Sequence, residues 1–241
     1  MQKLSVIIPC YNEEDSISQL HDLLIPEIQV LQSQYEIELI FVDDGSKDAT
    51  NKLLQQRFGS YEFVKIVTHL KNTNLGGALR TGIKNSTGHL IAMLDSDCSY
   101  HPQILHRLLA TLDEKTDIVG ASGLHPQGNI EGVSEYRKML SRTVAGGYKI
   151  LLSHKIHSPT SMIRVYRRKV LENVTFHSND FMAVTELLAK SLLQGYKFKE
   201  IPAINRRRNF GTSKLNVRKE TKNHLILWKR IAAYRFFKRK F

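Results

Sequence analysis

The chain contains only two cysteines, Cys10 and Cys98, among its 241 residues. Two cysteines cannot form a framework of several disulfides, and no Cys/His spacing in the chain resembles a zinc site. Both absences are typical of a protein that stays in a reducing compartment, so we expect a cytoplasmic location.

Long apolar runs are also missing. The first run, residues 4–8, ends at Pro9 and an acidic stretch, and it is shorter than the apolar core of a signal peptide. The run at residues 225–228 falls far short of the ~20 residues that a membrane-spanning helix needs. We therefore expect no membrane span, and the chain shows no internal repeat or low-complexity segment.

Acidic residues are scarce near the C-terminal end. Residues 206–241 contain thirteen Lys or Arg and a single acid, Glu220, so this segment accounts for the whole net charge of +12. Such a segment attracts polyanions, although a solvated basic helix without any partner has the same composition. No RNA-binding aromatic motif is present, so we expect no nucleic-acid partner and favour an anionic membrane surface, with the protein peripheral on its inner face.

The composition, 41% hydrophobic and 24% charged, is that of an ordinary globular protein. Short β-branched runs alternate with helical stretches through the first half. We expect strands over 4–8, 37–42, 63–68, 89–94 and 117–120, and helices over 13–32, 48–58 and 76–85. This alternation favours an α/β fold with a mostly parallel central sheet flanked by helices.

The second half changes its pattern after Gly120. We expect a loop through Gly132, helices near 134–153 and 180–194, strands near 162–166 and 197–204, and a final basic helix over 216–240. The apolar residues of this last helix lie around its whole circumference and form no clean stripe. The sequence thus predicts a single domain that ends in a basic helix.

Polar residues gather where three predicted strands end, at residues 9–13, 43–46 and 95–97. Ligands of open α/β sheets bind outside the carboxyl ends of the strands. We therefore expect these three clusters to converge at one edge of the sheet.

The Asp95-Ser96-Asp97 cluster places two carboxylates on one turn. Two close carboxylates repel each other unless a cation lies between them, and hard oxygen ligands suit Mg²⁺ or Mn²⁺ that is also held by substrate phosphates. The alternative is an ordinary turn in which one Asp caps the next helix.

The Asp43-Asp44-Gly45-Ser46 cluster has two interpretations as well. A carboxylate here could accept hydrogen bonds from a nucleobase or ribose. Alternatively, the segment is an Asp-Gly turn in which Ser46 caps the following helix.

Two further segments also have two interpretations each. Gly76-Gly77 could let the backbone approach a phosphate or could serve close packing. The loop from Arg206 to Lys214 is either a phosphate-binding loop or a solvated basic loop.

The order of these motifs resembles glycosyltransferase family 2 and its GT-A fold. The motifs that carry the resemblance are Ser5 to Glu14 (SVIIPCYNEE), Val42 to Ser46 (VDDGS) and Asp95 to Asp97 (DSD). In the second half, residues 137–142, 160–168, Glu186 and 200–215 look like the polyprenyl-phosphate sugar transferase branch, which dolichol-phosphate mannose synthase typifies.

The resemblance implies an inverting enzyme that moves a hexose from a GDP- or UDP-sugar to a polyprenyl phosphate, such as dolichyl or undecaprenyl phosphate. It divides the chain into a GT-A catalytic domain, residues 1–215, and a basic C-terminal helix, residues 216–241. Within the domain, residues 1–120 would be the nucleotide-sugar half and residues 121–215 the acceptor half.

The resemblance also implies roles for individual residues. It assigns the nucleotide-sugar site to Pro9, Tyr11, Glu13, Asp43, Asp44, Asp95 and Ser96. It places the Mg²⁺ or Mn²⁺ ion on Asp95 and Asp97, and it gives catalytic roles to these two residues and to Arg208 and Lys214, which would bind the donor phosphates. It turns Arg137, Ser141 and Arg164 toward the acceptor phosphate.

The chain departs from the branch at two positions, and these departures motivate an alternative. Ala121-Ser122-Gly123 stands where the branch carries an Arg, and Ser158-Pro159 where it carries an Asp before Thr160. A family 2 enzyme acting on a sugar hydroxyl, in polysaccharide or glycolipid synthesis, would need a catalytic carboxylate, for which Glu186 is the candidate. A phosphate acceptor is already ionised and needs none. A simple membrane- or nucleic-acid-binding module ranks last, because it leaves the acidic strand ends unexplained.

Overall fold

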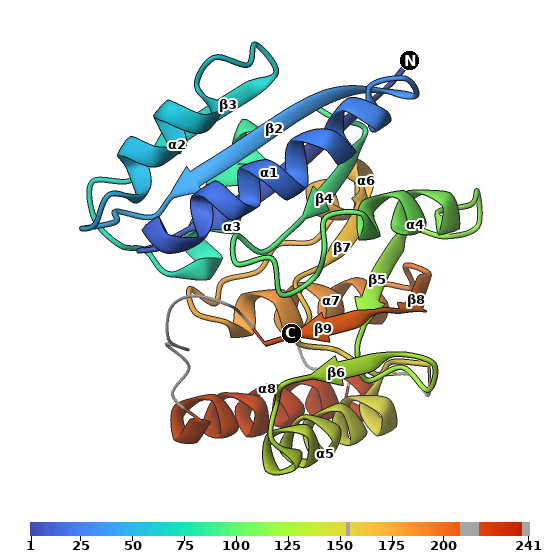
Figure 1. The fold of residues 1–241 in the computed structure, drawn as a ribbon. Helices are drawn as coiled ribbons and strands as arrows, with labels where there is room; N and C mark the ends of the chain where they lie inside the picture. The colour runs from blue at the N-terminus through green and yellow to red at the C-terminus, as the bar shows by residue number, and fades with distance from the viewer. Residues whose placement is uncertain (153–154, 208–216, 238–241) are drawn as a thin grey trace.

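Seven strands form the central sheet of the computed structural model, which describes residues 1–152, 155–207 and 217–237 (Figure 1). Their order across the sheet is β3 (Val64–Thr68), β2 (Tyr35–Asp43), β1 (Gln2–Cys10), β4 (Leu90–Met93), β7 (Arg164–Arg167), β5 (Ile118–Ser122) and β8 (Phe198–Pro202). Only β7 runs against its neighbours, because it is antiparallel to both β4 and β5, whereas the other pairs in this sheet are parallel. The prediction of a mostly parallel sheet is confirmed.

Helices cover both faces of this sheet. The helices on these faces are α1 (Glu14–Leu31), α2 (Thr50–Phe58), α3 (Leu75–Asn85), α4 (Ile104–Thr111), α6 (Arg168–Asn173) and α7 (Met182–Leu193), whereas α5 (Glu135–Leu151) and α8 (Val217–Phe237) pack against each other at one end of the molecule. The core under α1, α2 and α4 receives Val6 and Ile8 of β1, whereas the core under α3, α6 and α7 receives Ile7. A parallel strand buried on both faces in this way reads as a continuous apolar run in the sequence.

The second half adds a short parallel ribbon, β6 (Asn129–Glu131) with β9 (Ile204–Arg206). We predicted a single strand over 197–204, and this was wrong: the chain leaves the main sheet at Ala203. There Ala203 accepts a hydrogen bond from Asn129 and donates one to Ser122, so it joins the ribbon to the sheet. Two helices, α4 and α6, were not predicted.

Helix α8 packs against α5 and α7 rather than standing apart as a tail. Leu227 and Ile231 of α8 form a small apolar core with Tyr148 of α5 and Met182 and Ala189 of α7. This contact explains why α8 has no clean apolar stripe: one apolar side is packed, while Leu225, Ile226, Phe236 and Phe237 are exposed. Among the described helices, none combines the length and the apolar character needed to cross a bilayer.

Candidate functional site

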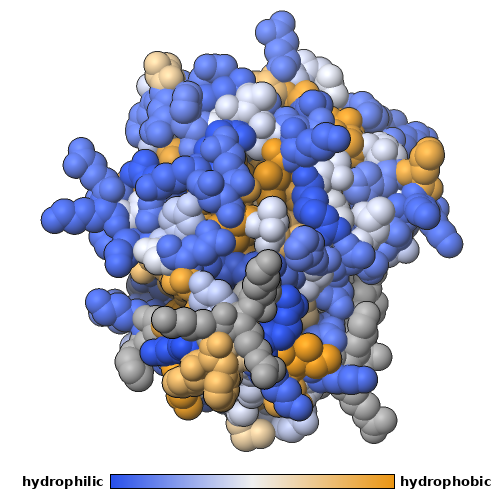
Figure 2. Space-filling view, turned by 180° about the vertical axis from the view of Figure 1, so that it is seen from behind, coloured by the Kyte–Doolittle hydropathy of each residue, from blue (hydrophilic) through white to orange (hydrophobic). Residues whose placement is uncertain are grey.

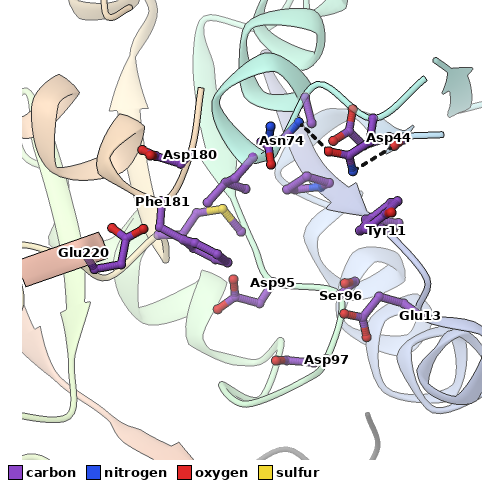
Figure 3. Close-up of a pocket in the computed structure, with 16 residues that line it drawn as sticks. Tyr11, Glu13, Asp44, Asn74, Asp95, Ser96, Asp97, Asp180, Phe181 and Glu220 are labelled. Carbon is purple, nitrogen blue, oxygen red and sulfur yellow. Dashed lines mark hydrogen bonds between the residues drawn. The ribbon is translucent and has the colours of Figure 1, made fainter. Parts of the chain in front are cut away.

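A cavity of about 280 Å³ lies at the edge of the sheet where the three polar clusters end (Figure 3). Its lining comprises Pro9, Cys10, Tyr11, Glu13, Asp44, Asn72, Asn74, Leu75, Ala78, Asp95, Ser96, Asp97, Met162, Asp180, Phe181 and Glu220. The predicted convergence of the clusters is therefore confirmed, since each of them contributes to one cavity.

The corner after β1 is fixed by hydrogen bonds to the corner after β2. Asn12, whose φ of 50° is left-handed, donates from its backbone N–H to Ser46 Oγ at 2.9 Å and accepts from the N–H of Lys47 at 2.8 Å. The backbone N–H of Glu13 donates to Thr50 Oγ1 at 2.8 Å. Ser46 thus holds this corner instead of capping α2, and the corner presents Tyr11 and Glu13 to the cavity.

The two neighbouring aspartates after β2 have different roles. Asp43 is buried and does not line the cavity: its Oδ1 accepts from the N–H of Ser46 at 3.0 Å and its Oδ2 from the Asn51 amide at 2.9 Å. Asp44 does line the cavity. The assignment of Asp43 to the nucleotide site stays a prediction, and in the structure each of its oxygens accepts a hydrogen bond that holds the turn together.

The Asp95-Ser96-Asp97 turn follows β4, and all three residues line the cavity. Asp97 Oδ1 accepts from the N–H of Ser99 at 2.9 Å, which closes the turn around Cys98 at a left-handed φ of 55°. Such a conformation is uncommon for a residue with a Cβ, and the Asp97 bond helps to hold it. The turn is also tied to β9, since Arg206 N–H donates to Ser99 O at 2.8 Å.

The cavity is strongly acidic. Of its lining residues within the described ranges, six are Asp or Glu and none is Lys, Arg or His. The local potential shows in Cys98, where burial, followed by the charges of Asp97 and Asp95, raises the pKa of the thiol to about 12. A negatively charged ligand can enter such a cavity only together with cations.

The donor set suits a hard divalent cation that is shared with a ligand. No three His, Cys, Asp or Glu side chains in the described part of the chain gather into a complete metal site. Asp95 and Asp97 could therefore supply two carboxylates, and the remaining oxygens would come from water and from a bound diphosphate. This is the usual manner in which Mg²⁺ is held by one or two carboxylates and substrate phosphates.

Glu186, the candidate base for a hydroxyl acceptor, lies inside the protein rather than in the cavity wall. Its carboxylate pairs with Lys190 Nζ at 2.8 Å and accepts from the N–H and the hydroxyl of Ser178 at 2.9 and 2.7 Å. Burial alone would raise the pKa of Glu186, but the bonds from Lys190 and Ser178 outweigh it and lower the pKa to about 2. A group so placed is a structural anion and a poor proton acceptor.

Arg164 is also internal, fully buried on β7. Its guanidinium donates to the backbone carbonyls of Pro159 at 2.7 Å, Val184 at 3.0 Å and Ser158 at 3.2 Å. The carbonyls of Ser158 and Pro159 thus serve in place of the carboxylate that the sequence lacks there. The direct contact of Arg164 with an acceptor phosphate stays a prediction; in the structure Arg164 holds the segment that leads to Thr160.

A second cavity of about 240 Å³ adjoins the first and shares Leu75, Asp95, Met162 and Phe181 with it. Its polar lining is rich in hydroxyl groups and includes Tyr100, Ser141, Ser158, Thr160, Ser161 and Asn205. Ser141 lines this cavity together with Asp95, and its role in binding the acceptor phosphate stays a prediction. Arg137 is exposed on α5 and lines neither cavity, and Arg208 and Lys214 lie outside the described residues.

Several lining residues were missed in the sequence. Asp180 and Phe181 precede α7 and Glu220 lies on α8, more than eighty residues after the DSD turn, so only the packing of α7 and α8 brings them to the cavity. By contrast, Gly76 and Gly77 serve packing, the second of their two interpretations. A Cβ on Gly76 would lie 2.1 Å from Ser178 O, and one on Gly77 would lie 2.2 Å from Thr73 Oγ1.

Residues 5–175 match the family model described as glycosyl transferase family 2. The chain is 32% identical over 216 residues to the undecaprenyl-phosphate 4-deoxy-4-formamido-L-arabinose transferase of Klebsiella pneumoniae, covering 89% of this chain and 63% of that protein. It is 29% identical over 215 residues to the dolichol-phosphate mannosyltransferase of Pyrococcus furiosus, covering 88% and 59%. The chain thus spans about three fifths of the length of these curated relatives.

Solved structures show the same fold. Glucosyl-3-phosphoglycerate synthase from Mycobacterium tuberculosis, in complex with UDP, superposes with a TM-score of 0.71 at 18% identity, covering 96% of this chain and 79% of that one. This likeness confirms the predicted GT-A architecture. Because the family match covers most of the chain and includes all three strand-end motifs, this protein belongs to glycosyl transferase family 2.

Proposed function

We propose that this protein transfers a hexose from a nucleotide-diphosphate sugar to a polyprenyl phosphate, with Mg²⁺ or Mn²⁺ held by Asp95 and Asp97. The observation that carries the proposal is the single acidic cavity in which the DSD turn meets Tyr11, Glu13 and Asp44. The names of the curated relatives, which are transferases acting on undecaprenyl phosphate or dolichol phosphate, support the choice of acceptor. Solved neighbours in complex with UDP and Mn²⁺ or Mg²⁺ support the choice of donor and metal.

The acidic lining explains why a metal is needed. The donor diphosphate is an anion, and its charge increases when it leaves the sugar. A divalent ion would neutralise the leaving diphosphate, as metals do in related transfer chemistry. Arg208 and Lys214, from the basic segment, are proposed to bind the same phosphates.

The chain's own residues would mainly align the two substrates. An oxygen of the acceptor phosphate would attack the anomeric carbon from the face opposite the diphosphate, so that the new C–O bond forms as the old one breaks and the configuration inverts. The acceptor is already ionised at neutral pH, so no side chain has to remove its proton. The internal ion pair of Glu186 with Lys190 agrees with such a mechanism, because Glu186 does not line the second cavity and so does not face an acceptor there.

A lipid acceptor requires the protein to contact a membrane, and α5 and α8 provide an apolar surface for this contact. Their exposed large apolar side chains are Tyr136, Met139, Ile150, Leu225, Ile226, Phe236 and Phe237. Figure 2 shows apolar surface at the lower end of the molecule, the end at which Figure 1 places both helices. Basic side chains interleave with these groups on α8, as in helices that lie in the interface of anionic membranes.

One observation favours a second candidate, transfer to a sugar hydroxyl. The described lining of the second cavity carries hydroxyl and amide groups but neither Lys nor Arg. Such a surface suits a sugar at least as well as a phosphate.

A single assay separates the two candidates. Purified protein is incubated with Mn²⁺, labelled UDP- or GDP-sugars, and either undecaprenyl phosphate in detergent or an oligosaccharide. We expect label in the organic phase with the lipid phosphate and none on the oligosaccharide. Label on the oligosaccharide alone would establish the hydroxyl acceptor, and no transfer from any donor would refute the proposed function.

A further inference from the structure

The side chain of Phe181 lies where three cavities meet. Phe181 lines the first cavity, the hydroxyl-rich second cavity, and a third cavity of about 200 Å³ between α5 and α8. Within the described lining, it is the one residue that all three share. Figure 3 shows its ring pointing toward Asp95, on the side of the cavity opposite Tyr11 and Asp44.

The donor hexose has to lie between the diphosphate and the acceptor. In the proposed function the diphosphate binds with the metal at Asp95 and Asp97, and the acceptor binds in the second cavity. The side chains common to the first and second cavities are Leu75, Asp95, Met162 and Phe181. Because the acceptor attacks the anomeric carbon from the face opposite the diphosphate, the hexose belongs at these shared residues, and the nucleoside on the other side of the diphosphate.

The wall at this junction suits a pyranose ring. Leu75, Met162 and Phe181 make it apolar, and the Phe181 side chain is well exposed, at 45%. A pyranose has C–H groups on its faces and hydroxyl groups around its rim, so an aromatic ring can pack on a face while a few polar groups hold the rim. Glu220 supplies a polar group, because it lines both the first and the third cavity together with Phe181. A hydroxyl that donates to a carboxylate forms a charge-assisted hydrogen bond.

Hydrogen bonds hold Phe181 and Glu220 in a fixed relation. Asp180, the residue before Phe181, accepts from the N–H of Met182 at 3.1 Å with Oδ1 and from the side-chain amide of Asn223 at 3.1 Å with Oδ2. Asn223 lies on α8, about one turn after Glu220. The segment that carries the aromatic ring is thus tied to the helix that carries the carboxylate, so the two groups are placed before a ligand binds.

We infer that the hexose of the donor packs on the ring of Phe181 and donates a hydroxyl hydrogen bond to Glu220, which makes these two residues determinants of sugar specificity. The inference rests on the proposed function, which supplies the positions of the diphosphate and the acceptor. Both residues lie beyond residue 175, where the match to the family model ends. Sugar specificity thus comes from the start of α7 and from α8 rather than from the three strand-end motifs.

The test compares nucleotide sugars with free nucleotides by calorimetric titration of the whole protein in the presence of Mn²⁺. The probes are UDP, GDP, UDP-glucose, UDP-galactose, UDP-N-acetylglucosamine and GDP-mannose, and the nucleotide sugar that binds most tightly is followed in the variants. Failure of every probe to bind would refute the proposed function. Binding of UDP or GDP without binding of any nucleotide sugar would overturn this inference and leave the nucleotide site intact, so the two failures are distinguishable.

Removal of the Phe181 ring should act on the sugar and not on the nucleotide. In Phe181→Ala we expect the affinity for the nucleotide sugar, relative to the free nucleotide, to fall at least tenfold, a change of about 1.4 kcal/mol. Phe181→Tyr keeps the ring and should keep this ratio within about threefold of the parent. An unchanged ratio in Phe181→Ala, or an equal loss for both ligands, would show that the hexose does not lie on Phe181.

The matched control is Phe63→Ala, which makes the same change at a partly buried position that lines none of the three cavities. This variant should keep the ratio of the parent even where it lowers stability, because a smaller folded fraction affects both ligands equally. If Phe63→Ala lowers the ratio as much as Phe181→Ala does, the assignment to Phe181 is wrong.

Glu220→Asp tests the carboxylate without removing its charge. The shorter side chain draws the carboxylate back toward α8, so the bond to the sugar hydroxyl should be lost. We expect the ratio of nucleotide-sugar to nucleotide affinity to fall about tenfold, as for the loss of one hydrogen bond to a charged group. A ratio equal to that of the parent would overturn the assignment of Glu220. Melting temperatures of all the variants establish that folded proteins are being compared.

Discussion

Helix α5 meets helix α8 at Gly147, where a methyl group has no room. A Cβ built there would lie 2.2 Å from Cζ2 of the Trp228 ring, whereas a Cβ on the adjacent Gly146 would meet nothing within 4 Å. The substitutions Gly147→Ala and Gly146→Ala therefore make the same change in the same helix, one against α8 and one into open space. Both variants gain the same helix propensity, about 1 kcal/mol.

The difference between these two variants isolates the cost of the contact. Overpacking costs about 1–3 kcal/mol, so Gly146→Ala should be more stable than the parent and Gly147→Ala less stable than Gly146→Ala by about 2 kcal/mol. For a domain of this size that gap corresponds to roughly 4–8 °C in melting temperature. Differential scanning calorimetry measures it directly.

The same pair tests whether α8 belongs to the site. In Gly147→Ala the new methyl group should push the Trp228 ring and α8 away from α5. Because Glu220 of α8 lines the cavity, nucleotide binding should weaken in this variant and stay unchanged in Gly146→Ala. Titration with UDP and Mn²⁺ at a temperature where both variants are folded provides the measurement. Equal melting temperatures and equal affinities would show that α8 is not seated on Gly147 as described.

Four further outcomes are expected. Donor affinity should fall at least tenfold on chelation of the metal, and a variant with Asp95 and Asp97 both replaced by Ala should bind weakly with or without chelator, as titration calorimetry can show. Glu186→Gln should lower stability by about 3 kcal/mol, because it removes the carboxylate that balances the buried charge of Lys190, while the transfer rate per folded molecule is retained. A rate loss of a hundredfold would instead favour a catalytic carboxylate. Burial lowers the pKa of His224 to about 4, so between pH 6.5 and 4 the unfolded chain binds a proton that the folded chain does not. The free energy of unfolding should therefore decline as the pH falls through this range. Denaturant unfolding of His224→Gln should lack this contribution to the pH dependence. Ile226→Glu should reduce sedimentation with vesicles rich in phosphatidylglycerol, and undiminished binding would exclude this face of α8 as the contact.

The first half of the fold could be predicted from the sequence because its strands are buried on both faces. Such strands read as apolar runs, and the helices between them are long enough to show a period. The second half of the fold could be predicted less well. β8 and β9 follow each other with only Ala203 between them, and nothing in the residues 197–204 reveals that the chain changes sheets there. Six residues of α6 are too few to display a helical period, although the apolar pairs 104–105 and 108–109 of α4 could have indicated that helix.

The site shows the same division between local and non-local information. The DSD turn and the corner at Tyr11 and Glu13 follow directly from strands, so their position could be predicted. That Asp44 lines the cavity and Asp43 does not could not be predicted. It depends on which of the two adjacent carboxylates accepts the hydrogen bonds of Ser46 and Asn51. The internal roles of Arg164 and Glu186 depend on partners that only the packing of β7 and α7 supplies.

Charge is distributed in this protein in a way that links the end of the sequence to the cavity. Residues 1–205 are neutral in sum, yet packing gathers six carboxylates around one cavity, five of them from this neutral part. A diphosphate adds further negative charge, so its binding requires cations that the described lining does not contain. In the proposed function a divalent ion at the DSD turn would supply some of them, and the basic residues that begin at Arg206 are the largest other group of cations in the chain. Donor binding should therefore weaken on chelation, which removes the bound ion, and also with rising salt, which screens the attraction between the diphosphate and basic side chains.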